Sequence, residues 1–70
     1  MKLKFTNHAQ YRIEERGISI EDIKFVINNP DFSEINNGKI KCRSLIDGET
    51  LVAVYLKSRG EFVILTAYYL

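Results

Sequence analysis

The segment HAQYRIEERGIS, residues 8 to 19, gathers the side chains best suited to acid–base and phosphate chemistry in this 70-residue chain. It holds the single histidine, His8, followed by Arg12 and Arg16. Histidine titrates near neutrality, and arginine presents forked donors that match phosphate oxygens. RNA cleavage without a metal needs a base for the 2′-hydroxyl, an acid for the leaving oxygen and cations around the phosphate. The segment therefore predicts a site in which His8 transfers protons and the two arginines bind phosphate, with Glu15 as a further candidate base.

A second interpretation treats the same segment as a solvated helix face. At about 100° per residue, the polar side chains form a stripe beside the buried stripe. Ion pairs between Glu15 and either arginine contribute only about 0–1 kcal/mol on such a surface. Arg16, however, falls almost on the buried stripe, where an unpaired arginine is unusual. Both interpretations stand at this point. The expected buried stripe consists of Phe5, Ala9 and Ile13.

The stretch HAQYRIEERGISIEDIKFVINNP resembles the opening of a widespread group of small prokaryotic domains with the pattern H-A-x-x-R-x-x-x-R-G-I-S, followed by a helix and an Asn-Pro stop. The stretch LVAVYLKSRGEFVILTAYYL is similar to the closing hairpin of BrnT-type toxins, which belong with the RelE-like and barnase-like ribonucleases. The resemblance implies a compact α+β domain and metal-independent RNA cleavage. It implies site roles for His8, Arg12 and Arg16, and for Thr66 as a group that binds phosphate or orients a water.

The composition predicts one compact domain spanning residues 1–70. The chain is 46% hydrophobic and 27% charged, with a net charge of +1. A single cysteine, Cys42, forms no internal disulfide, and with His8 it offers too few ligands for structural zinc. No apolar run is long enough for a signal peptide or a membrane span. We therefore expect a cytoplasmic protein with no metal, no cofactor and no membrane partner.

Two helices and several strands are predicted around these residues. Residues 2–5, KLKF, alternate as in an edge strand. A helix over 7–16 begins at a Thr6 or Asn7 cap and ends at Gly17, and a second over 20–28 begins at Ser19 and ends before Pro30. The segments DFSEIN, KIKCRSLI, TLVAVYL and EFVILTAYYL then read as strands separated by glycine turns. The predicted fold is α+β, with a helical hairpin on one face of a four- to five-stranded antiparallel sheet, as in RelE and BrnT.

The turns predict which strand face the helices cover. A loop centred on Arg59 and Gly60 pairs Tyr55 with Ile64 and Ala53 with Thr66. This leaves Val52, Val54, Leu56, Val63, Leu65 and Ala67 on a purely apolar face, which we expect to pack against Ile13, Ile23 and Ile27.

The turn after Ile46 predicts the face of the preceding strand. A three-residue turn with a bulge at Gly48 sets Cys42 opposite Val52 and directs Cys42 and Ile40 into the core. A two-residue turn would instead place charges beside valines on the face expected to be buried. The favoured register gives a polar face on which we predict substrate binding. Its predicted binding residues are Lys41, Arg43, Tyr55, Lys57 and Tyr68, with Thr66 beside them.

Two functions follow from these patterns. The first is a toxin-like ribonuclease domain that acts on RNA and is held by a cognate antitoxin. The second is a non-catalytic interaction module that binds another protein, or a second copy as a homodimer, through the edge strand KLKF or the sheet face bearing Tyr55 and Tyr68. The histidine–arginine helix favours the first, and the near-neutral charge favours the second.

Overall fold

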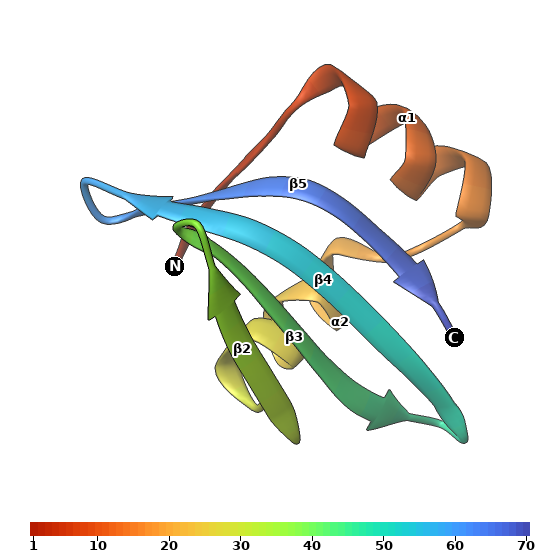
Figure 1. Cartoon of the computed structure of the whole chain (residues 1–70). Coiled ribbons are helices and arrows are strands. Elements are labelled where there is room, and N and C mark those ends of the chain that lie inside the picture. The colour runs from red at the N-terminus through yellow and green to blue at the C-terminus, as the bar shows by residue number, and fades with distance from the viewer.

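A computed structural model describes residues 1–70 as one layer of two helices on a five-stranded sheet. The strands lie in the order β1-β5-β4-β3-β2, and β2 to β5 form an antiparallel meander. The predicted α+β class and helical hairpin are confirmed, but β1 runs parallel to β5, so the sheet is mixed. In Figure 1, α2 lies behind β3 and β4, while α1 runs along β5. The elements are β1 (Lys2–Phe5), α1 (Asn7–Arg16), α2 (Ile20–Asn28), β2 (Phe32–Asn36), β3 (Lys39–Ile46), β4 (Glu49–Ser58) and β5 (Glu61–Tyr69).

The helix ends follow local capping chemistry, and both predicted ranges are confirmed. The Thr6 hydroxyl accepts a 3.0 Å hydrogen bond from the backbone N–H of Ala9 at the start of α1. Gly17 ends α1 at φ 64°, a left-handed conformation that glycine adopts without steric cost. The Ser19 hydroxyl accepts a 3.0 Å bond from the N–H of Asp22 at the start of α2. These bonds satisfy amide groups that a helix leaves without internal partners.

The turn between β3 and β4 corrects part of the predicted register. Asp47 and Gly48 both have positive φ, at 49° and 84°, and Ile46 pairs with Glu49. This two-residue loop suits the twist of a hairpin, and Asp-Gly is a favoured sequence for it. The predicted three-residue turn with a Gly48 bulge is therefore wrong. Cys42 pairs with Ala53 rather than with Val52.

A bulge in β5 changes the alternation of its side chains. Tyr55 pairs with Ile64 as predicted, but Val54 pairs with Thr66, so Leu65 between them has no partner on β4. An unpaired residue of this kind shifts the pleat of every residue that follows. Ala53 consequently pairs with Ala67, and the predicted pairing of Ala53 with Thr66 is wrong.

Along β4 and the first half of β5 the helices cover the face opposite to the one predicted, whereas Ile40, Cys42 and Ala67 face the helices as predicted. Val54, Val63 and Leu65 are only partly buried, and Val52 is buried without joining the cluster that links helices and sheet. The physical reason lies in the two-residue turn, because it places the cations of β3 beside these valines, and covering that face would desolvate unpaired charges. The alanines at 53 and 67 instead allow the helices to approach closely. The core cluster comprises Ala9, Ile13, Ile18, Ile23, Val26, Ile27, Cys42, Leu51, Ala53, Tyr55, Ile64 and Ala67.

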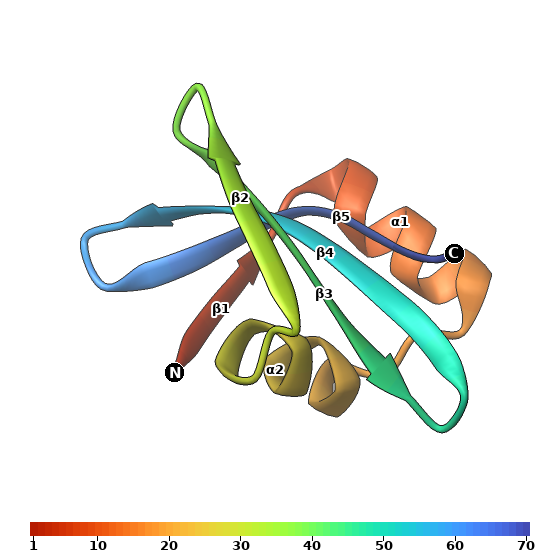
Figure 2. The same ribbon diagram turned by 60° about the horizontal axis from the view of Figure 1, so that its bottom comes forward.

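We call the uncovered side of the sheet the open face. Its side chains alternate along each strand with those of the core, and no helix packs on it. In Figure 2 the tip of the β2–β3 hairpin projects away from α2, so the open face extends past the helical layer. The open face comprises Lys2, Lys4, Phe32, Glu34, Asn36, Lys39, Lys41, Arg43, Leu45, Thr50, Val52, Val54, Leu56, Glu61, Val63, Thr66 and Tyr68.

Candidate functional site

The three site residues predicted on α1 lie in the helical layer, each in a different setting. His8 is exposed in the first turn. Arg12 donates from Nη1 to Oε1 of Glu15 at 2.9 Å, which is one of the ion pairs weighed from the sequence. Arg16 donates from Nη1 to the backbone carbonyl of Ala67 at 2.8 Å, so its guanidinium ties the end of α1 to β5. Arg16 thus has a structural partner that the sequence pattern did not reveal.

Thr66, the fourth predicted catalytic residue, points to the open face. It pairs with Val54 and is partly buried. The surface has four hollows, and none is lined by His8, Arg12, Arg16 or Thr66. The structure therefore does not gather these residues around one cavity, and their joint catalytic role remains a prediction from sequence.

The open face carries an excess of positive charge. Five of its side chains are lysines or arginine and only two are glutamates, although the whole chain has a net charge of +1. Glu61 pairs with Lys2 at 3.3 Å and with Lys4 at 3.4 Å. The three cations of β3 take part in none of the ion pairs of the structure. These free cations are Lys39, Lys41 and Arg43.

The predicted substrate-binding set is divided by the sheet. Lys41, Arg43 and Tyr68 share the open face as predicted. The prediction that Tyr55 binds substrate on this face is wrong. Tyr55 lies in the core, where it is 8% exposed and its ring centroid is 5.4 Å from that of Phe62. Lys57 shares the Tyr55 side of β4, with its amine 5.5 Å from the centroid of Phe62. The cause is the same reversal of the covered face.

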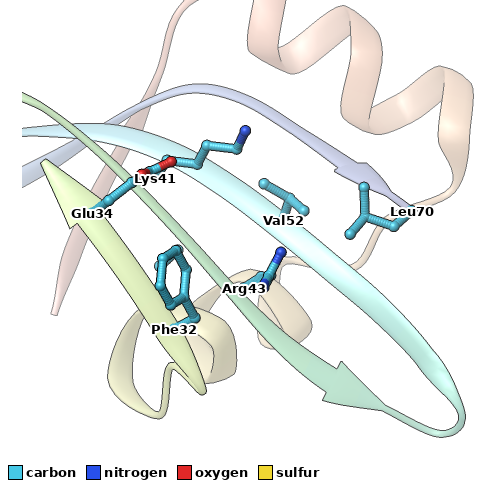
Figure 3. Close-up of a pocket in the computed structure, with 7 residues that line it drawn as sticks. Phe32, Glu34, Lys41, Arg43, Val52 and Leu70 are labelled. Carbon is cyan, nitrogen blue, oxygen red and sulfur yellow. The ribbon is translucent and has the colours of Figure 1, made fainter. Parts of the chain in front are cut away.

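One hollow of about 80 Å³ lies over the middle of β3. Figure 3 shows Phe32 and Glu34 projecting into it from β2, and Lys41 and Arg43 extending toward Val52 from either side. The Arg43 guanidinium carbon lies 4.8 Å from the centroid of the Phe32 ring, within the range of a cation–π contact. The hollow combines two cations, one carboxylate and an apolar surface. Its lining is completed by Cys42 and Leu70.

Phe32 and Glu34 belong to this site but were not predicted. A local signal for them was present in the Asn37-Gly38 turn. A two-residue hairpin loop at that turn sets Asn36 opposite Lys39, and therefore Glu34 opposite Lys41 and Phe32 opposite Arg43. Applying the rule for two-residue turns to this hairpin would have placed both residues beside the predicted cations.

The chemistry of Cys42 is set by burial. Desolvation raises the pKa of its thiol to about 11, and a backbone hydrogen bond from Ala53 opposes the shift. The thiol is therefore protonated at neutral pH, in which state it is a poor nucleophile and a poor metal ligand. No group of three or more His, Cys, Asp or Glu side chains is arranged to hold a metal ion.

The fold and the open face define a small α+β domain with one sheet face free for binding. Residues 5–69 match the model of a family described as a domain of unknown function, DUF4258, and the chain belongs to this family. No curated protein and no solved structure matches the chain. No helix is long and apolar enough to cross a membrane.

Proposed function

We propose that the protein acts on RNA that lies across the open face of its sheet. The observation that carries the proposal is the excess of positive charge on this face, including three cations of β3 without an acidic partner. Phosphate neutralisation by Lys and Arg supplies most of the affinity of a protein for a nucleic acid. Tyr68 and Thr66 add hydroxyl donors to the same face. The charge is thus concentrated where a polyanion can reach it.

The proposed reaction is metal-independent cleavage, as the resemblance to BrnT and RelE-like toxins implies. The 2′-hydroxyl attacks phosphorus while a base takes its proton, and the 5′-oxygen leaves with a proton from an acid. The products are a 2′,3′-cyclic phosphate and a 5′-hydroxyl. In this proposal Lys41 and Arg43 bind the phosphates on the open face. The sequence prediction assigns proton transfer to His8 and phosphate contacts to Arg12 and Arg16, which lie in the helical layer on the other side of the sheet, so binding and cleavage are separate parts of the proposal. A cognate antitoxin would then cover the same face.

The test measures binding and cleavage separately in EDTA. Binding of labelled mixed RNA is followed by fluorescence anisotropy, and cleavage is followed on gels. We expect Lys41→Ala and Arg43→Ala each to weaken binding several-fold and to reduce its salt dependence. Lys24→Ala, which removes an equal charge from α2, is the matched control and should bind like wild type. Cleavage that is lost in His8→Ala or Arg12→Ala would support the catalytic assignment.

The outcomes separate the two parts of the proposal. RNA binding with no cleavage would remove the catalytic part and leave a binding domain. Equal binding by wild type, Arg43→Ala and Lys24→Ala would show that the open face is not the contact surface. Absence of RNA binding would overturn the proposal.

Edge strand β2 favours a second candidate function, the interaction module. All five residues of β2 are exposed, and Ile35 is 71% exposed. A partner strand, from an antitoxin or a second copy, can add to such an edge. A homodimer through the open face is disfavoured because two faces with the same excess of positive charge repel each other. Light scattering at high micromolar concentration distinguishes the 8.1 kDa monomer from a dimer.

A further inference from the structure

We infer that the hollow over β3 is a subsite for one unstacked guanine base of a single-stranded RNA. The inference rests on the proposed function, because it assumes that RNA reaches the open face. It goes further by naming the base and the side chains that read it. Three properties of the hollow lead to it: an aromatic surface, a mixture of donors and acceptors, and a limited size.

The aromatic surface is the Phe32–Arg43 pair. The guanidinium lies over one side of the ring at 4.8 Å, and Phe32 is still 49% exposed. Bases that leave a helix stack on aromatic rings and on guanidinium planes, and this contact is open to every base. The pair therefore supplies a stacking surface at the edge of a basic face.

The hydrogen-bonding groups narrow the choice of base. Lys41 and Arg43 are donors only, whereas the Glu34 carboxylate is an acceptor only. None of the three takes part in an ion pair. A bare phosphate in the hollow would be repelled by Glu34, so the hollow favours a ligand that offers donors on one edge and acceptors on another.

Guanine offers both edges. Its N1–H and N2 amine are adjacent donors for a carboxylate, and its O6 and N7 are adjacent acceptors for Lys or Arg. Adenine presents no such pair of adjacent donors, and uracil has a single N–H between two carbonyls. The Glu34 side thus suits the Watson–Crick edge of guanine, and the Lys41 and Arg43 side suits O6 and N7.

The size of the hollow also favours single-stranded RNA over a duplex. Its volume of about 80 Å³ holds part of a single base lying on the sheet. A base inside a duplex is stacked on both faces and has its Watson–Crick edge occupied, so it cannot enter without being extruded. We therefore expect single-stranded RNA to bind in preference to a duplex of the same sequence.

The experiment compares three RNA probes on the full chain. Short oligouridines carrying one guanosine, one inosine or no purine are titrated by fluorescence anisotropy. Inosine lacks the N2 amine and keeps N1–H, O6 and N7, so it removes only one of the two proposed donors to Glu34. We expect the guanosine probe to bind about tenfold tighter than the inosine probe, in line with the discrimination of a good bidentate contact.

Two variants and one control locate the contact. Glu34→Gln should reduce the preference for guanosine over inosine to near unity, while binding of plain oligouridine stays equal or improves because a negative charge is removed. Phe32→Leu should weaken the guanosine and inosine probes alike, since it removes stacking but keeps an apolar side chain. Glu21→Gln removes the same charge from exposed α2 and should leave the preference unchanged. Circular dichroism confirms that each variant is folded.

The outcomes distinguish this inference from the proposed function. Equal binding of guanosine and inosine probes by wild type would overturn the guanine subsite while RNA binding itself stands. A preference that survives Glu34→Gln would place the reading of the base elsewhere. Failure of every probe to bind would overturn the proposed function, and the subsite with it.

Discussion

The two faces of the sheet are built from alternate residues of the same strands, yet they differ in almost every physical respect. The covered face meets the helices through aliphatic side chains and the small residues Ala53 and Ala67, which are fully buried. The open face pairs the cations of β3 with valines that lie outside the core cluster. Residues that stabilise the fold and residues that are available for binding thus occupy neighbouring positions of one chain. A single step along a strand therefore moves from a residue that supports the fold to one available for recognition.

The largest contrast is expected at Cys42, which lies between Lys41 and Arg43. Burial raises the pKa of its thiol from 9.0 to about 11 in the folded protein. Because the pKa is raised only in the folded state, the protonated thiol contributes its full share to the stability of the fold below about pH 9. This contribution is lost as the pH rises toward 11. The free energy of unfolding should fall by about 2–3 kcal/mol across that window. Urea denaturation at pH 8 and pH 10.5 measures the change.

Cys42→Ala is the control for this pH dependence. The variant is less stable throughout because it leaves a cavity, but its stability should fall less between pH 8 and 10.5. Burial also raises the pKa of Tyr55, and this contribution remains in the variant. An equal slope for both proteins would show that the thiol does not ionise on unfolding and that the covered face is less desolvated than the structure implies.

A smaller contrast is expected between the neighbours Ala67 and Thr66. Ala67 is fully buried on the covered face, whereas Thr66 lies partly exposed on the open face. Ala67→Leu should destabilise the protein by about 1–3 kcal/mol, because a large side chain cannot fit beneath the helices. Thr66→Leu should cost less than about 1 kcal/mol. Thermal unfolding of both variants checks the register, and a reversed order would show that the bulge at Leu65 does not direct Ala67 to the covered face.

The smallest contrast lies on α1, between two arginines predicted to bind phosphate. Arg16→Ala removes the hydrogen bond to the Ala67 carbonyl and should cost about 1–2 kcal/mol. Arg12→Ala breaks the ion pair with Glu15, which is 45% exposed, and a contact with the exposed Tyr11 ring, and should cost about 0–1 kcal/mol. Chemical denaturation measures both. Equal losses would mean that the bond between α1 and β5 contributes little to holding the covered face together.

The elements of the fold were predictable where the signal is local. The caps at Thr6 and Ser19 and the stop at Gly17 fix the helix ends through hydrogen bonds within a few residues. The glycine turns likewise mark the hairpins. The parallel pairing of β1 with β5 had no local signal, because it joins residues about sixty positions apart and depends on how the helices return the chain to the sheet.

The face of the sheet on which each side chain lies was harder to predict, because a register error of one residue reverses the face. The length of the turn at Asp47 and the bulge at Leu65 together decide which face is covered, and neither follows from composition. Within the candidate site, Lys41 and Arg43 were grouped correctly because alternation along one strand decides their shared face. Tyr68 was also grouped with them because the errors at the Asp47 turn and at the Leu65 bulge cancel. Tyr55 was misplaced because its assignment depended on the covered face. Phe32 and Glu34 were missed because no register was assigned to the hairpin of β2 and β3.

The uneven distribution of charge gives this nearly neutral molecule an electric dipole directed through the sheet. A negatively charged partner approaching in solution is therefore turned toward the open face before any contact is made. The association rate should depend on ionic strength even though the net charge is only +1, because the Debye length of about 8 Å in physiological salt still spans the height of the exposed lysines. Isoelectric focusing reports only the total charge and therefore does not detect the dipole.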